Sequence, residues 1–203
     1  MSTTSTSPVA QEPLPIMLAN TISIDRGRVR DSLAERADRE RWVREIVTHM
    51  DLSPGPSSIE AIASPAAERL ISLRDGIRRL AAEHTRDPRT LGQSPVPDVV
   101  TAMTIINSTS SLSSVWPELE WEDSTARRRD VWAGGTYLDA LCAVLARQMI
   151  DLSTSTQWDR LQPCLAPACA QFFVKDHVRR QWCGPNCGNR ARVARHTQRH
   201  QGE

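Results

Sequence analysis

The chain has 203 residues, of which 39% are hydrophobic and 24% are charged, the composition of an ordinary globular protein. No apolar run approaches the roughly 18 residues that a membrane-spanning helix needs, and the N-terminus lacks the basic start and apolar centre of a secretory signal. We therefore expect a cytoplasmic protein that does not associate with a membrane.

The net charge of +1 hides an uneven distribution along the chain. Residues 160–203 carry eight basic and two acidic residues, a net charge of +6, whereas residues 1–159 carry 17 basic and 22 acidic residues, a net charge of −5. A basic excess confined to one end attracts polyanions such as nucleic acids. A solvated basic tail without a partner is the alternative interpretation.

The N-terminal quarter combines a polar tail with apolar segments. Residues 1–13 are rich in Ser, Thr and Pro, so we expect them to be disordered. Residues 15–27 form a short apolar cluster that is compatible with a strand or a helix. Apolar residues at three- and four-residue intervals then predict a helix from residue 31 to about residue 50, and the Pro- and Gly-containing stretch 51–58 predicts a loop.

Two further helices are expected in the middle of the chain. Ser64 is a suitable N-cap and Pro65 a suitable first helical residue. The apolar stripe of this helix comprises Leu70, Leu73, Ile77 and Leu80. We interpret His84, which follows the stripe, as a partly buried or helix-end residue and not as a ligand. Residues 97–108 are also compatible with a helix, with one face made of Val100, Met103 and Ile106.

Two tryptophan-containing segments predict a β-hairpin. Residues 116–121 (WPELEW) and 127–132 (RRRDVW) would be its strands, joined by a polar turn. We expect the tryptophans to fill a small core and not to form a ligand cage; they are Trp116, Trp121 and Trp132. The arginine triplet 127–129 is expected to be the solvated flank of the turn.

A well-defined helix should follow Gly135. Thr136 is its expected N-cap, and Asp139, three residues on, completes a capping box. Cys142 falls on or beside the apolar stripe of this helix. We therefore interpret Cys142 as a small buried hydrophobic residue and not as a metal ligand.

The other four cysteines lie within 24 residues near the C-terminus. Their spacing, C-x4-C, thirteen residues, then C-x3-C, predicts a tetrahedral Zn²⁺ site, and a reducing compartment disfavours disulfides. The ligands would be Cys164, Cys169, Cys183 and Cys187. Four thiolates complete the shell without a histidine and leave no open position for a substrate, so we expect no enzymatic activity.

The residues between the cysteine pairs predict a small zinc-binding fold. Cys164 and Cys169 would lie on a tight loop, followed by a strand at 171–174, a turn and a return strand at 179–182. Aromatic side chains are expected to cover the metal, namely those of Phe172, Phe173 and Trp182. Pro185 suits the start of a helix that carries the second cysteine pair. This arrangement is treble-clef-like, and zinc would supply much of its folding free energy.

The helix after the second pair is rich in arginine. Arg192, Arg195 and Arg199 recur at three- and four-residue intervals and would form an exposed stripe. Arginine suits phosphate because its guanidinium binds in a bidentate manner. The expected nucleic-acid-binding residues are Arg179, Arg180, Arg190, Arg192, Arg195 and Arg199. A solubilising face without a partner is the alternative.

Several motifs resemble one known family. Cys187–Arg190 reads CGNR, preceded by C-x4-C, an aromatic pair and a basic stretch before Trp182-Cys183. The chain thus resembles the bacterial CGNR zinc-finger proteins, in which the finger follows a mostly helical N-terminal ABATE domain. Leu18–Thr21 (LANT) is similar to a signature near the start of that domain. The resemblance implies zinc on the four cysteines and a stress-related transcription regulator.

Together these observations predict an α+β protein. A disordered tail (1–13) would precede a mainly α-helical N-terminal domain with a small β-hairpin (14–157) and a C-terminal treble-clef-like zinc finger (158–203). We expect a zinc-dependent DNA-binding transcription regulator whose finger contacts DNA and whose N-terminal domain senses a signal or contacts proteins. The alternative is a protein-interaction module in which the finger is only a structural clip. A nuclease is a third hypothesis, but the sequence shows no partnered acid or base that would support its catalysis.

The expected partners follow from the charge distribution. DNA is the first candidate for the finger and RNA the second. The sequence is also compatible with a homodimer and with a small-molecule or protein partner of the N-terminal domain.

Overall fold

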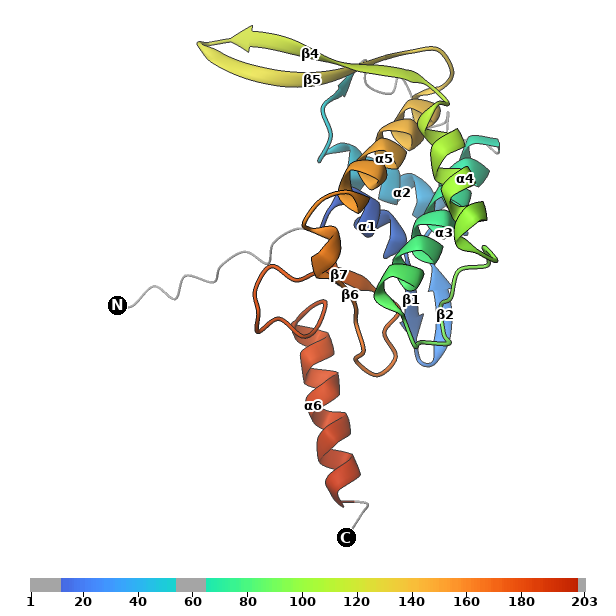
Figure 1. The fold of residues 1–203 in the computed structure, drawn as a ribbon, viewed down its shortest axis with the longest axis vertical. Helices are drawn as coiled ribbons and strands as arrows, with labels where there is room; N and C mark the ends of the chain where they lie inside the picture. The colour runs from blue at the N-terminus through green and yellow to red at the C-terminus, as the bar shows by residue number, and fades with distance from the viewer. Residues whose placement is uncertain (1–11, 54–64, 201–203) are drawn as a thin grey trace.

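The computed structural model describes residues 12–53 and 65–200. Most of the predicted disordered tail, most of the predicted loop 51–58 and the predicted N-cap Ser64 lie outside the described residues. The described chain forms a helical body, a long β-ribbon at one end of the body and a zinc-finger-like region at the other end (Figure 1). None of the described helices is both long enough and apolar enough to cross a membrane.

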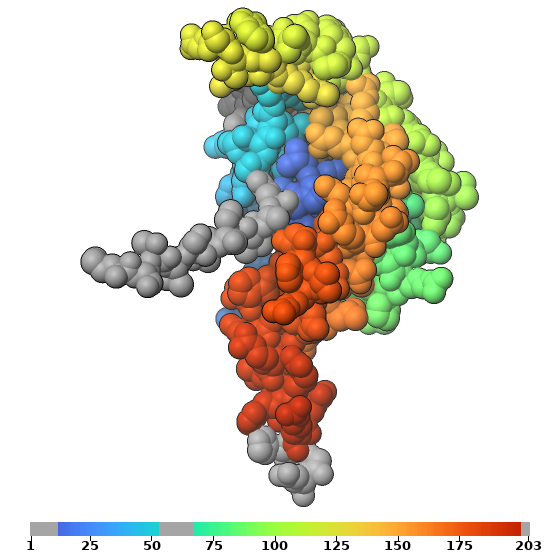
Figure 2. Space-filling view, turned by 60° about the vertical axis from the view of Figure 1, so that its left-hand side comes forward, coloured from blue at the N-terminus to red at the C-terminus, as the bar shows by residue number. Residues whose placement is uncertain are grey.

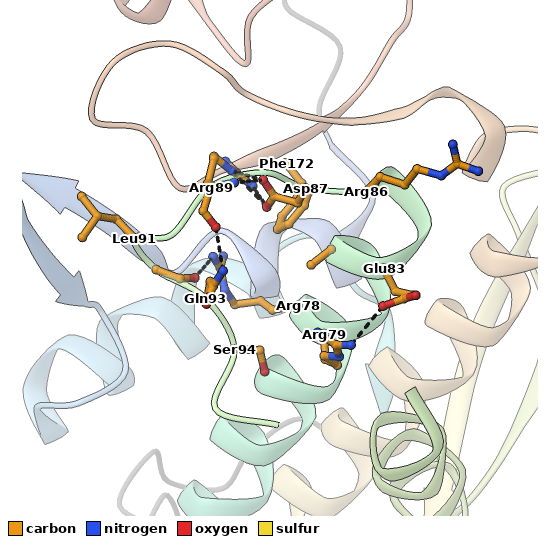
Figure 3. A pocket seen from close by; sticks show the side chains of 12 residues that line it. Arg78, Arg79, Glu83, Arg86, Asp87, Arg89, Leu91, Gln93, Ser94 and Phe172 are labelled. Atoms are coloured by element: carbon orange, nitrogen blue, oxygen red, sulfur yellow. Dashed lines mark hydrogen bonds and ion pairs between the residues drawn. The ribbon is translucent and has the colours of Figure 1, made fainter. Parts of the chain in front are cut away.

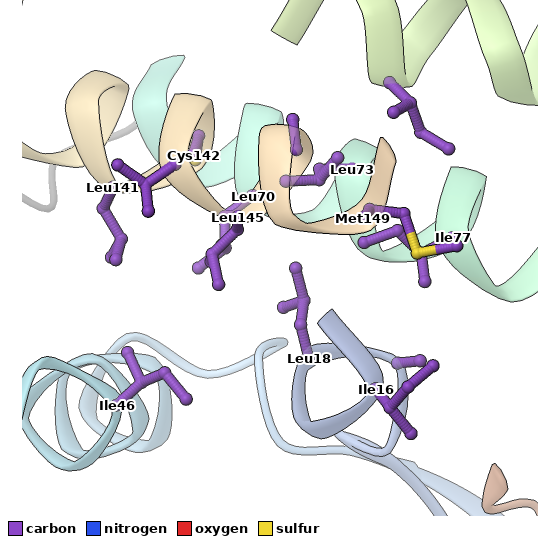
Figure 4. Close-up of a cluster of buried hydrophobic side chains, with 14 of the residues drawn as sticks. Ile16, Leu18, Ile46, Leu70, Leu73, Ile77, Leu141, Cys142, Leu145 and Met149 are labelled. Atoms are coloured by element: carbon purple, nitrogen blue, oxygen red, sulfur yellow. The ribbon is translucent and has the colours of Figure 1, made fainter. Parts of the chain in front are cut away.

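Five helices make the body (Figure 1). They are α1 (Leu14–Ala19), α2 (Arg36–Val47), α3 (Pro65–Thr85), α4 (Val99–Ser110) and α5 (Tyr137–Ser153). Leu70, Leu73 and Ile77 of the predicted α3 stripe are fully buried. They meet side chains of α1, α2 and α5 in one hydrophobic core (Figure 4). The mainly α-helical N-terminal domain is therefore confirmed.

Helix α5 lies at the centre of this core. Thr136 and Asp139 form the predicted capping box at its N-terminus. Cys142 has no exposed surface and lies among the core side chains (Figure 4), as predicted. Burial raises the pKa of the Cys142 thiol to about 12, so this cysteine stays protonated at neutral pH.

The structure decides one open prediction and corrects another. The apolar cluster 15–27 divides into α1 and a short antiparallel hairpin of β1 (Ile22–Asp25) and β2 (Arg28–Asp31). In α4, Val100 and Met103 are exposed, and the residues facing the core are Ala102, Ile106 and Thr109. The predicted face of α4 was therefore wrong for two of its three residues, because the helix is turned so that the row Ala102, Ile106 and Thr109 faces the core.

The tryptophan-containing hairpin is present. Strands β4 (Ser114–Glu122) and β5 (Thr125–Ala133) pair antiparallel around a turn at Asp123 and Ser124. Among the described residues, one further strand joins this sheet: the two-residue strand β3 (Leu52–Ser53), which pairs parallel with β5 near the body. The ribbon extends away from the helices (Figures 1 and 2).

This projection leaves most of the ribbon in solvent. Trp132 packs at the edge of the body core, but Trp116 is 41% exposed and Trp121 is 70% exposed. The prediction that all three tryptophans fill a core was therefore wrong, because a two-stranded ribbon without a covering layer has no interior. The arginine triplet lies on β5, where its members form ion pairs with Glu122, Asp130 and Glu120.

The C-terminal region contains two short strands and one helix. A single 3-10 turn (Trp158–Arg160) leads into β6 (Leu161–Pro163), which pairs antiparallel with β7 (Phe172–Val174). The predicted return strand 179–182 does not form. Strand β6 pairs with one edge of β7, and side chains, among them that of Asn20, hydrogen-bond to the other edge. Helix α6 (Pro185–His200) follows and points away from the body (Figure 1).

Candidate metal centre

The four predicted ligand cysteines converge at the base of α6. Cys164 and Cys169 lie in the loop between β6 and β7, while Cys183 lies just before α6 and Cys187 in its first turn. Their sulfur atoms all lie within 4.8 Å of one another. This is the one cluster of potential metal ligands within residues 12–53 and 65–200, and it contains no histidine or carboxylate.

The spacing of the sulfur atoms fits a zinc ion. The Sγ atoms of Cys169 and Cys183 are 3.8 Å apart, those of Cys187 and Cys169 3.7 Å, and those of Cys183 and Cys187 3.3 Å. Four sulfurs at about 2.3 Å from a tetrahedral Zn²⁺ are separated by about 3.8 Å. All four cysteines are free, and these separations far exceed a disulfide bond of about 2.05 Å.

The electrostatics of the cluster also favour a bound cation. A hydrogen bond with Cys164 is the main cause that raises the pKa of the Cys183 thiol well above its ordinary value, and a hydrogen bond with Cys169 adds to it. Negative charges this close together repel one another, and a divalent ion removes that penalty. The backbone N–H of Cys183 donates to Cys164 Sγ (3.4 Å), and Arg190 donates to Cys187 Sγ (2.9 Å). Both donors stabilise the thiolate form that binds zinc.

The two phenylalanines of β7 face opposite sides. Phe173 packs with the cysteine cluster, and Trp182 and Cys183 lie against the same group. Phe172 instead belongs to the core of the helical body. The prediction that Phe172 covers the metal was therefore wrong, because successive side chains of a strand point to opposite faces. This alternation joins the finger to the body through a shared core.

Two arginines of the body bind the loop that carries the first cysteine pair. The guanidinium of Arg89 donates to three backbone carbonyls of this loop, at Cys164 (3.4 Å), Cys169 (3.3 Å) and Gln171 (2.8 Å). Asp87 forms a bidentate ion pair with Arg89. Arg89 also lies over the ring of Phe172, 4.6 Å from its centre. Arg89 thus fixes the backbone of the zinc loop.

The second arginine, Arg78 of α3, is buried, with 3% of its surface exposed. Its guanidinium donates to the carbonyls of Ala19 (2.6 Å), Gly92 and Ala170 (3.1 Å). It therefore connects α1, the loop after α3 and the zinc loop. Burial, reinforced by the charge of Arg89, lowers the pKa of Arg78 to about 10. Arg78 and Arg89 also line a pocket of about 240 Å³ (Figure 3).

Two further residues dock the finger. The Asn20 side chain accepts from the backbone N–H of Phe172 (2.8 Å) and donates to its carbonyl (2.9 Å), so it takes the place of a neighbouring strand for β7. Glu12 accepts from the N–H of Val174 (2.8 Å) and from Arg180 (2.6 Å), and burial raises its pKa. Our sequence reasoning assigned neither residue a role, although Asn20 lies within the LANT motif.

The six arginines expected to bind nucleic acid fall into two groups. Arg180 is largely buried and donates to the carbonyls of Val174, Trp182 and Cys183 as well as to Glu12. Arg190 donates to the carbonyl of Ala168 (3.0 Å) and to Cys187. Both therefore support the metal centre. Arg190 is itself exposed, but its guanidinium is engaged by these contacts. The second group comprises Arg179, Arg192, Arg195 and Arg199, which are also exposed.

Two family models match consecutive parts of the chain. The family model ABATE, described as "Putative stress-induced transcription regulator", matches residues 12–156, and the CGNR zinc finger model matches residues 160–200. No curated protein matches the chain. The finger match and the cysteine geometry identify the metal as Zn²⁺. The chain therefore belongs to the ABATE family and carries a CGNR zinc finger at its C-terminus.

Proposed function

We propose that this protein is a zinc-dependent transcription regulator whose finger binds DNA through α6. One observation carries the proposal: α6 contains four arginines and no acidic residue, and it projects from the body (Figures 1 and 2). A basic helix that stands clear of its own protein can approach a phosphate backbone from several sides. The family description supports a role in transcription.

The exposed arginines gather on one side of α6. Arg192, Arg195 and Arg199 share a face at i, i+3 and i+7. Among the residues that the structure describes, no carboxylate forms an ion pair with any of the three. Their charges are thus available to an external anion such as phosphate.

Trp182, three residues after Arg179, packs against the same side of α6. A Cβ atom on Gly188 would lie 3.3 Å from the ring of Trp182, so the segment before α6 packs against the helix at Gly188. Gly188 lies seven residues before Arg195 and eleven before Arg199, which places it on the arginine face. Arg179 lies in this packed segment and is exposed.

Salt-dependent binding to duplex DNA tests the proposal. The zinc-loaded full-length protein should bind with an affinity that falls as salt rises, by about 0.9 log units per log unit of salt for each neutralised phosphate. The triple variant Arg192→Ala, Arg195→Ala, Arg199→Ala should bind more weakly, with a slope lower by up to about 2.7. Fluorescence anisotropy across a salt series measures both quantities.

A matched control separates this face from total charge. Arg127→Ala, Arg128→Ala, Arg129→Ala removes the same charge from β5, at the end of the molecule opposite α6 (Figure 1). This control should keep the slope of the original protein. Unchanged affinity and slope in the α6 variant, with zinc content intact, would disprove DNA binding by this face.

A second candidate function rests on the docking of the finger. The contacts of Arg78, Arg89 and Asn20 with the zinc loop support a finger that acts only as a structural clip within a protein-interaction module. The absence of binding to DNA or RNA at low salt, with one tightly bound zinc, would favour this function. We propose no catalytic activity, since four thiolates leave zinc no open position.

A further inference from the structure

A second row of side chains runs along α6 beside the arginine face. Asn189, Arg192 and His196 recur at i, i+3 and i+7, and Val193 lies one turn after Asn189. All four are exposed, and Val193 has 66% of its surface in solvent. This row, here called the polar row, lies away from Cys187 and Ala191, the buried residues of the helix. Packing on the buried side of the helix therefore does not account for Asn189, Arg192 and Val193.

Two members of the polar row are held together before any partner binds. Arg192 donates a hydrogen bond of 2.8 Å to Oδ1 of Asn189. The bond restricts two flexible side chains, which lowers the entropy lost when they bind a partner. The Asn189 oxygen keeps a second lone pair, and its amide group has two N–H donors. The pair thus presents both donors and acceptors in a fixed arrangement.

The dimensions of α6 fit the major groove of B-form DNA. An α-helix with its side chains is about 10–12 Å wide, and sixteen residues extend over about 24 Å. The major groove is about 12 Å wide and admits one helix. Helix α6 points away from the body (Figures 1 and 2), and Asn189, Arg192 and Val193 are exposed on the side opposite Cys187 and Ala191, so the body does not cover them.

We propose that α6 is a recognition helix that enters the major groove of duplex DNA. The inference rests on the proposed function and adds a division of roles. Asn189 and Arg192 hydrogen-bond to base edges, and Val193 contacts a thymine methyl group. Arg195 and Arg199 bind phosphates and set the position of the helix. Duplex RNA does not fit, because its major groove is too deep and narrow for side chains to reach the bases.

Selection from a random duplex library tests this inference. The zinc-loaded full-length protein should enrich a defined sequence. With that sequence in hand, Asn189→Ala should lose discrimination at one base pair by about 5- to 150-fold, while its affinity for random DNA and its salt slope stay unchanged. Arg199→Ala should weaken binding to all sequences alike and lower the slope by about 0.9.

Gln198→Ala provides the control, since Gln198 is exposed on α6 but lies nine residues from Asn189, on the opposite side of the helix. This variant should keep affinity and discrimination. The recognition role is overturned if no sequence is enriched, if Asn189→Ala keeps full discrimination, or if duplex RNA binds more tightly than DNA. Non-selective, salt-dependent binding to duplex DNA would refute only this role, whereas no binding by the original protein would refute the proposed function itself.

Discussion

Helices α5 and α6 are similar in length, but they are stabilised by different interactions. Helix α5 has 17 residues, twelve of them buried, and a capping box satisfies its N-terminus. Helix α6 has 16 residues, and Cys187 and Ala191 are its only buried side chains among those described. An isolated helix of this length is marginal in water. The stability of α5 therefore comes from packing along its whole length, whereas that of α6 depends on the zinc site at one end.

This difference has a functional consequence. A helix that is buried over most of its residues leaves little surface for another molecule, whereas a helix anchored only at its base leaves its outer surface free. The metal replaces the hydrophobic contacts that α6 lacks, because zinc ligation contributes directly to folding free energy. The comparison predicts that α5 and α6 respond to different perturbations.

Removal of zinc should have the largest effect. Cys183→Ser or a strong chelator should abolish metal binding and unfold α6 while the helical body stays folded, because structural zinc contributes about 10–16 kcal/mol in finger peptides. Metal analysis and far-UV circular dichroism measure both effects. Cys142→Ala should keep one zinc per chain, since Cys142 is not a ligand. Retention of α6 helicity without metal would contradict the comparison.

Arg89→Ala tests the connection between the two regions. The change leaves three loop carbonyls without this donor and leaves Asp87 unpaired at a site where both side chains are largely buried. Breaking such a pair costs about 3–5 kcal/mol. Stability to urea should fall and zinc should pass more quickly to a chelator. Arg86→Ala, at an exposed position lining the same pocket, is the control and should retain its zinc.

Leu145→Ala should affect the body alone. Leu145 of α5 is fully buried, and a cavity of this kind costs about 2–5 kcal/mol. Urea unfolding should show this loss, while the native protein keeps its zinc. Ile150→Ala on the same helix is the control, because Ile150 lies at the surface and should cost much less. Loss of zinc from folded Leu145→Ala would show that the two helices are not separately stabilised.

The capping box of α5 should contribute the least and should depend on pH. Burial opposes ionisation of Asp139, but hydrogen bonds from Thr136 and the ion pair with Arg69 outweigh it and hold the pKa below 3.8. A lowered pKa in the folded state stabilises the protein above that pH, and the contribution is lost on acidification. Asp139→Ala should cost about 0.5–2 kcal/mol near neutral pH and less in acid. Urea unfolding at several pH values measures this.

Asp151→Ala is the matched change at the other end of α5. Asp151 is exposed, and its loss should change stability by less than about 0.5 kcal/mol. An equal cost for Asp139→Ala at acidic and neutral pH would show that its carboxylate charge is not what stabilises the helix.

The sequence predicted features that depend on neighbouring residues. Apolar spacing identified α3 and α5, and the spacing of Cys164, Cys169, Cys183 and Cys187 identified the residues that converge in the structure. The same local reasoning was wrong for Trp121, which is exposed, and for Phe172, which faces the body. A tryptophan in a strand does not reveal whether another layer covers that strand, and an aromatic pair does not reveal which member faces the metal.

By itself, then, the sequence determined the ligand set, the helical periods and the arginine spacing of α6, because each is fixed within a few turns of chain. Only the tertiary structure decided which arginines are exposed. Arg180 meets Glu12 from the far end of the chain, and Arg89 meets loop carbonyls about 80 residues later in the sequence. A guanidinium that contacts such distant partners has the same local sequence signal as one in solvent, and only the folded chain distinguishes them.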